Sequence, residues 1–176
     1  MKTKTTILSV LLLIGILFTF SCDKLLTFDV SDSTTVTIDA NPLPISSPVE
    51  IPTPDVTTNS ESEFEQNDTK VELVKEIILK RLALTITSPS DKTFSFLKSI
   101  EIYISADGED ETKLAWNNDV QSDAQSIELE TTTQALDSYV KKSSYKLRTE
   151  VTTRESLTQS VDIKIDFTFQ VTADPF

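Results

Sequence analysis

The sequence predicts a mainly β protein, built as an antiparallel β-sandwich of about seven or eight strands with one or two short helices. Two observations favour this fold class. Apolar and polar residues alternate along much of the chain, most regularly over residues 160–172, which is typical of strands with one buried face. Runs of turn-forming residues separate the alternating stretches at short intervals, so the strands should pack as two sheets.

The first 22 residues have the organisation of an export signal. Lys2 and Lys4 precede an apolar run over residues 7–20, which is shorter than the about 20 residues that a membrane-spanning helix needs. Ser21 and Cys22 follow, and Cys22 is the only cysteine of the chain. We therefore expect a signal-peptide helix within residues 1–21 and a lipid on Cys22, with an ordinary secretory signal and a chance cysteine as the alternative.

The residues before Cys22 also bear on location. The ending Phe18-Thr19-Phe20-Ser21-Cys22 resembles the loose lipoprotein signals of Bacteroidota, although only Ser21 fits the usual pattern well. This resemblance implies attachment to the outer membrane through the lipid. Asp23-Lys24 does not resemble an acidic surface-export signal, so we expect the protein to face the periplasm.

The amino-acid composition excludes several kinds of binding partner and catalytic site. The chain has 28 acidic and 16 basic residues, a net charge of −12, so nucleic acid is not an expected partner. There is no histidine, no cysteine other than Cys22, and no glycine beyond Gly15 except Gly108. Nucleophilic triads, thiolate or imidazole metal sites and glycine-rich nucleotide loops are therefore excluded. We expect no enzyme activity and no cofactor.

Residues 22–60 should hold N-terminal strands and an extended segment. Alternation predicts strands over 25–30 and 34–39, separated by a Ser-Asp-Ser turn at 31–33. Residues 41–55 contain five of the seven prolines, which favours extended backbone. This segment is either a spacer from the membrane or a crossover lying along the sandwich. We favour the crossover, because the preceding strands would otherwise lack partners.

Residues 61–176 should form the sandwich domain, beginning with helical elements. A helical turn is expected around Phe64, and Thr69-x-x-Glu72 is a capping box that predicts a short helix reaching Ile78. From Ile78 to residue 86 every second residue points to one face, and Pro89 ends the strand.

Residues 93–105 should form a strand with a bulge near Leu97-Lys98, so that the phenylalanines and the isoleucines can both face the core. Asp107-Gly108 predicts a hairpin turn, followed by a return strand whose Trp116 should point inward. Further strands are expected over 123–130, 145–153 and 160–172. Between the first two, Thr132 or Thr133 should cap a short helix that carries an Asp137–Lys141 pair.

The segments LALTITSP, LKSIEIYISADGEDETKLAW, TQALDSYV, YKLRTEVTT and VDIKIDFTFQV occur in this order between Leu82 and Val171. This order resembles the group-2 late-embryogenesis-abundant (water-stress) domain. The chain departs from that family at Ser88-Pro89, where the family favours Asn-Pro. The resemblance implies an immunoglobulin-like sandwich and a stress-protective role, and it implies no catalytic residue.

Two candidate sites remain. Four acids at the hairpin could bind calcium, although their spacing does not match an EF-hand and a solvated turn is the favoured interpretation: Asp107, Glu109, Asp110 and Glu111. Tyr103 alternates with the inward isoleucines, so it should face outward and is the candidate interaction residue.

The sequence therefore predicts a non-catalytic, lipid-anchored envelope protein with a structural or protein-interaction role, whose partner is another envelope protein. A carbohydrate-binding or glycan-processing module is the alternative, and it requires an exposed aromatic platform beside carboxylates.

Overall fold

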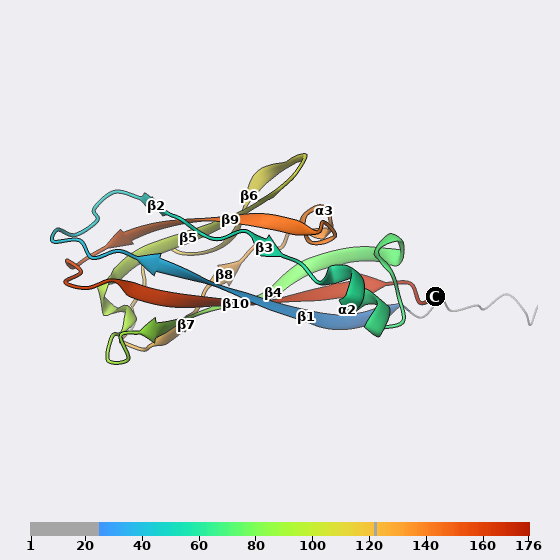
Figure 1. Ribbon diagram of the computed structural model, residues 1–176, viewed down its shortest axis with the longest axis horizontal. Coiled ribbons are helices and arrows are strands. Elements are labelled where there is room, and N and C mark those ends of the chain that lie inside the picture. Colours follow the sequence, from blue (N-terminus) through green and yellow to red (C-terminus); the bar gives the residue numbers. More distant parts are fainter. Residues whose placement is uncertain (1–24, 122) are drawn as a thin grey trace, which may run out of the picture.

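A computed structural model describes residues 25–121 and 123–176, and it confirms the β-sandwich (Figure 1). The strand pairs in the described part of the chain are all antiparallel. The first sheet has the order β1 (Leu26–Ile38), β10 (Val161–Ala173), β4 (Val74–Ser88) and β7 (Ser126–Glu128). The second has the order β2 (Val49–Ile51), β9 (Ser144–Thr153), β5 (Leu97–Ala106), β6 (Glu109–Asn117) and β8 (Glu130–Thr131), with β3 (Val56–Thr57) also paired to β9.

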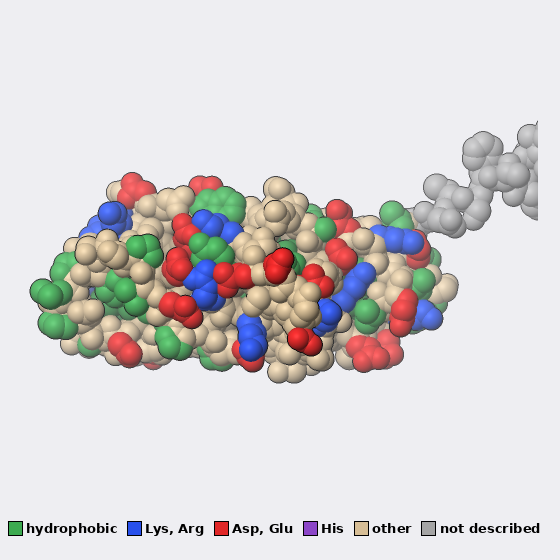
Figure 2. Space-filling model, turned by 90° about the horizontal axis from the view of Figure 1, so that it is seen from above, with side chains coloured by type: hydrophobic (Ala, Val, Ile, Leu, Met, Phe, Trp, Pro, Cys, Tyr) green, Lys and Arg blue, Asp and Glu red, His purple; other side chains and the backbone are tan. Residues whose placement is uncertain are grey.

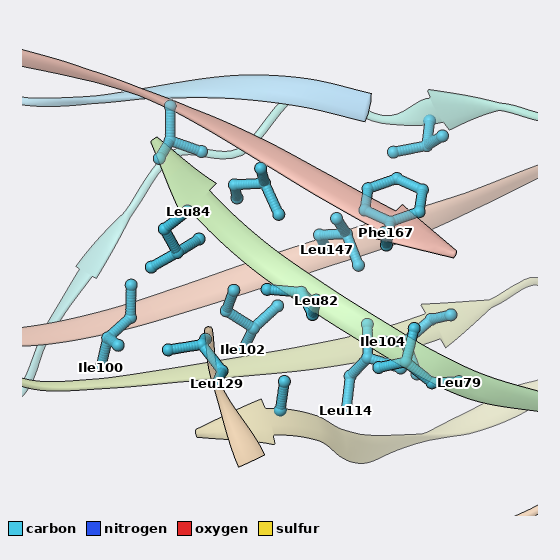
Figure 3. Packing of buried hydrophobic residues seen from close by; sticks show 14 of the residues in the cluster. Leu79, Leu82, Leu84, Ile100, Ile102, Ile104, Leu114, Leu129, Leu147 and Phe167 are labelled. Atoms are coloured by element: carbon cyan, nitrogen blue, oxygen red, sulfur yellow. The ribbon is translucent and has the colours of Figure 1, made fainter. Parts of the chain in front are cut away.

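One hydrophobic core fills the space between the sheets. Leu82 and Leu84 of β4 approach Ile100 and Ile102 of β5 across this space (Figure 3), and all four are at most 1% exposed. Burying one such side chain stabilises the folded protein by about 1.5–3 kcal/mol relative to leaving it exposed. The core continues without a break from Val30 to Ala173, so the amino-terminal strand and the carboxy-terminal strand share it.

β10 forms as predicted, and it changes the interpretation of the chain's first strands. Every second residue of β10 is buried. β1 is one strand rather than two, because each of its residues from Leu26 to Ile38 opposes a residue of β10. The predicted turn at 31–33 is therefore wrong. The long ladder to β10 satisfies the backbone of these residues, and Ser31 and Thr168 join hydroxyls across it at 3.1 Å.

The proline-rich segment crosses between the sheets, as predicted. It leaves β1 in the first sheet and forms β2 at the edge of the second, where Glu50 opposes Glu150 of β9. β2 is confined between Pro48 and Pro52, since proline cannot donate to a ladder. The predicted helical turn is also present as α2 (Ser60–Gln66), and Phe64 is fully buried.

The predicted helix after Thr69 is wrong. Only a 3-10 turn, η1 (Val71–Leu73), forms before β4, and no side chain caps it. The Thr69 hydroxyl instead donates to the Asp174 carbonyl oxygen at 2.6 Å, which ties the start of β4 to the end of β10. Ile78 is half-buried while Ile77 is fully buried, because Lys80 is an extra residue opposite β10 and shifts the alternation.

The hairpin in the middle of the chain forms as predicted, but the strand expected over 93–105 begins only at Leu97, as β5. Phe94 and Phe96 lie in a 3-10 turn, η2 (Phe94–Phe96), before β5, and Lys98 is unpaired at a bulge, so both halves bury their apolar residues. The hairpin turns at Asp107-Gly108. Gly108 has φ = +77°, a conformation that favours glycine.

The predicted strand 123–130 is divided between the two sheets. β7 pairs with β4 and β8 pairs with β6, so the chain changes sheet at Leu129. The helix that follows is α3 (Asp137–Val140), which neither Thr132 nor Thr133 caps. The Thr132 amide donates to the Leu114 carbonyl oxygen and so extends the sheet instead.

Asp137 and Lys141 pair at 3.9 Å as predicted. Cys22 and the predicted signal peptide lie outside the described residues. In the part of the chain that the structure describes, no helix is long and apolar enough to cross a membrane.

Candidate functional site

Tyr103 lies on the outer face of the second sheet, as predicted, within a cluster of charged side chains. Its neighbours come from three adjacent strands: Glu101 from β5, Lys113 and Glu111 from β6, and Arg148 from β9. We call this surface the Tyr103 face. In Figure 2, which looks down on this sheet, acidic and basic side chains alternate there.

Cations cover the ring of Tyr103. The Arg148 guanidinium carbon lies 4.1 Å from the ring centroid, and the Lys113 ammonium lies 5.6 Å from it. Arg148 also binds Glu111 through two nitrogens, at 2.7 and 2.8 Å, and pairs with Glu150. Arg148 is thus held over the aromatic ring by carboxylates on two sides.

The hydroxyl of Tyr103 belongs to the same network of charged groups, because it donates a hydrogen bond to Glu101. The hydrogen bond from Lys113, at 2.6 Å, and the one from Tyr103 hold the pKa of the Glu101 carboxyl below its usual value. The same bond to Glu101 raises the pKa of Tyr103. Arg148 lowers the pKa of Glu111. All of these groups are therefore charged or hydrogen-bonded near neutral pH, which suits a preorganised contact surface.

Trp116 also lies on this face, so the prediction that it points inward into the core is wrong. Leu114 is an extra residue opposite β5, so both Leu114 and Ala115 are buried and Trp116 turns outward. Trp116 opposes Glu101 on β5 and Glu130 on β8, and its indole nitrogen donates to Glu130 at 3.0 Å. The one tryptophan of the chain is therefore half-exposed between two carboxylates.

The acidic hairpin does not gather its four carboxylates. Glu111 binds Arg148, and Asp110 accepts a hydrogen bond from Tyr139 through its backbone oxygen at 2.7 Å. Across the described residues, no group of three or more acidic side chains is arranged to hold a metal ion, Asp107 and Glu109 included.

A polar cleft of about 700 Å³, which the sequence does not predict, lies between α2 and the residues that follow α3. Its walls are tied together where Thr58 donates to the Lys142 carbonyl oxygen and Ser60 donates to the Val140 carbonyl oxygen at 2.6 Å. These two hydrogen bonds join residues that are 84 and 80 positions apart in the sequence, so no local pattern could indicate the cleft.

A smaller cavity of about 50 Å³ lies next to this cleft and is lined by Asp32, Asn59 and Tyr145. Tyr145 is 2% exposed, and its hydroxyl has no hydrogen-bond partner among the described residues. Burial raises the pKa of this phenol. Tyr145 otherwise packs its ring edge-on against Phe167 and Phe169 of the core.

Comparison with known proteins identifies no family. No family model matches the chain, and no curated protein matches it. Among solved structures, it is similar to one titled Turnip yellow mosaic virus, at 12% identity and a TM-score of 0.30, covering 87% of this chain and 96% of that one. It is also similar to one titled Desmodium yellow mottle tymovirus, at 12% identity and a TM-score of 0.24, covering 86% and 90%.

A third similar structure is titled for the promiscuous specificity of carbohydrate-binding modules from the β-sandwich superfamily. It has 14% identity and a TM-score of 0.31, covering 88% of this chain and 57% of that one. At these TM-scores the neighbours assign neither a family nor a ligand to this chain.

Proposed function

We propose that the protein is a non-catalytic, lipid-anchored envelope protein whose Tyr103 face binds another envelope protein. The observation that carries this proposal is the placement of Tyr103, Trp116 and Arg148 together on the outside of one sheet. Tyrosine, tryptophan and arginine are the residue types that contribute most binding energy at protein interfaces. The bonds to Glu101 and Glu111 fix the tyrosine and the arginine before a partner arrives, which lowers the entropy cost of binding.

The anchor is proposed from the sequence. Cys22 carries the lipid, and the protein is attached to the outer membrane and faces the periplasm. Three acyl chains on the mature cysteine would hold it there permanently, since each buried methylene contributes about 0.8 kcal/mol. The test is to fractionate cells that make the wild type or Cys22→Ala. The variant should move to the soluble fraction, and a variant that stays wholly with membranes would refute the anchor.

The binding surface is tested by site-specific photo-crosslinking in living cells. A photoreactive amino acid in place of Trp116 should capture one defined protein, and the same residue in place of Lys164, on the outer face of the other sheet, should not. Capture should be lost in a Tyr103→Ala background and retained in a Lys164→Ala background. Equal capture from both positions, or capture that Tyr103→Ala leaves intact, would contradict the proposal.

Carbohydrate binding is the second candidate, and the position of Trp116 favours it. An outward indole between Glu101 and Glu130 supplies an apolar ring beside hydrogen-bond acceptors, a combination that suits a sugar ring. The ring of Tyr103 is less suitable, because Arg148 covers it. Binding to a glycan array that is lost in Trp116→Ala and retained in Tyr103→Phe would support this function over the first.

A further inference from the structure

We propose that the end of the sandwich where β1 begins rests on the lipid bilayer, with Leu25 and Phe176 in contact with it. We call this the anchor end. The opposite end, where the chain leaves β1 toward β2, then points away from the membrane. The proposal rests on lipid attachment at Cys22 and adds to it the orientation of the whole domain and the residues that set it.

The first argument is the length of chain between the lipid and the fold. Leu25 is the third residue after Cys22, and β1 begins at Leu26. An extended chain spans at most about 3.6 Å per residue, so Leu25 lies within about 11 Å of the acylated residue. The proline-rich segment adds no length here, because it follows β1 in the sequence and its residues Val49–Ile51 are paired with β9.

The second argument is that apolar side chains are exposed at this end. Leu26 opposes Ala173 at the start of the ladder between β1 and β10, so Leu25 and the residues after β10 share one end of the molecule (Figure 1). Leu25 is 48% exposed and Phe176 is 72% exposed. The Phe176 amide donates to the Asp68 carbonyl oxygen at 3.1 Å, which holds the phenylalanine on the domain.

The third argument concerns charge. Lys75 and Asp174 at this end pair with each other at 2.6 Å, so the pair brings no net charge to the membrane. The chain as a whole is acidic, which disfavours attraction to anionic headgroups. The contact we propose is therefore apolar insertion at the interface, for which zwitterionic lipid is sufficient.

The opposite end supplies a matched control. Among the described residues, the other large hydrophobic side chains that are exposed are Leu43 and Val49, and Leu43 is 71% exposed, about the same as Phe176. Leu43 lies on the segment that joins β1 to β2, at the far end of the sandwich (Figure 1). Leu43 and Phe176 therefore differ in position but hardly in exposure.

The experiment uses the mature protein, purified with whatever lipid its host attaches, in phosphatidylcholine–phosphatidylethanolamine vesicles with brominated acyl chains, which quench tryptophan. Trp116→Phe provides the background, and single tryptophans are introduced as Leu25→Trp, Phe176→Trp or Leu43→Trp. At the anchor end the tryptophans should lose roughly half of their emission, as expected for side chains at the boundary of headgroups and acyl chains. Leu43→Trp should be unaffected.

The outcomes separate this inference from the anchor itself. Protein that floats with the vesicles but shows equal emission loss at positions 176 and 43, or none at either, keeps the anchor and overturns the orientation. No emission loss at either position is the result expected if the anchor end is a surface for a partner protein rather than for lipid. Protein that does not float with the vesicles refutes lipid attachment, and the orientation with it.

Discussion

The Arg148 guanidinium carbon lies 4.1 Å above the ring of Tyr103, and both oxygens of Glu111 hold it there. Replacing Arg148 by methionine keeps the length of the side chain but removes these bonds. We expect the free energy of unfolding to fall by about 1–2 kcal/mol, since the carboxylate bond is bidentate and the cation stacks on an aromatic ring. Urea denaturation provides the measurement.

Lys164→Met is the control for this change. Lys164 pairs with Asp166 at 2.6 Å on an exposed surface, and the cation–ring contacts among the described residues involve other cations, so the loss should be at most about 0.5 kcal/mol. Equal losses in the two variants would mean that Arg148 contributes only an ordinary surface ion pair.

The same network should make stability depend on acid pH. The pKa values of Glu101 and Glu111 are below the ordinary 4.5 in the folded protein. At acid pH the folded protein therefore binds fewer protons at these two carboxyls than the unfolded chain does. This stabilisation is present above pH 4.5 and is lost as the pH falls through the folded pKa values. Between pH 7 and pH 3, Glu111→Gln should therefore lose less stability than the wild type, by up to about 1 kcal/mol after solvent screening. Parallel pH dependences would contradict this.

Tyr145→Phe should leave stability unchanged or raise it by up to about 1 kcal/mol, because the hydroxyl is buried without a partner among the described residues. Tyr103→Phe is the matched control. Its hydroxyl donates to Glu101, so its removal should cost about 0.5–1.5 kcal/mol. Thermal melting of both variants distinguishes them, and a larger loss for Tyr145→Phe would show that this hydroxyl is bonded in solution.

Gly108 should tolerate asparagine better than alanine. Apart from Gly108 itself and its two neighbours along the chain, no atom lies within 4 Å of the position that a Cβ would occupy, so the cost of substitution comes from the positive φ alone. Gly108→Ala should lose about 1 kcal/mol, and Gly108→Asn roughly half of that, since asparagine adopts left-handed backbone more readily. If alanine matched the wild type in a melting experiment, the turn would have to adopt another conformation.

The elements that the sequence predicts well are those whose signal is local. β10 alternates without interruption, the hairpin has Asp107-Gly108, and the shift of the apolar residues before Ile100 indicates the bulge at Lys98. The outward position of Tyr103 also follows from alternation alone. Each of these features depends on residues within one strand or turn.

The sequence prediction is wrong where pairing with a distant strand determines the local structure or the direction in which a side chain points. The extra residues at Lys80 and Leu114 reverse the alternation only because β10 and β5 pair on both sides of them, so Ile78 and Trp116 face the wrong way in the sequence prediction. The Ser-Asp-Ser turn at 31–33 is overridden by the ladder to β10. The carboxylates and cations around Tyr103 come from β6 and β9, and the register that brings them together is a property of the sheet.

The ladder between β1 and β10 has a mechanical consequence. β1 begins at the anchor end and runs the length of the first sheet, and its 13 residues all oppose β10. A force that pulls β1 along its axis therefore loads all of these hydrogen bonds together in shear, and none can be opened first as in unzipping. We expect a high unfolding force when the protein is held at residue 25 and pulled through its other surfaces, which is how the lipid attachment proposed above would load it.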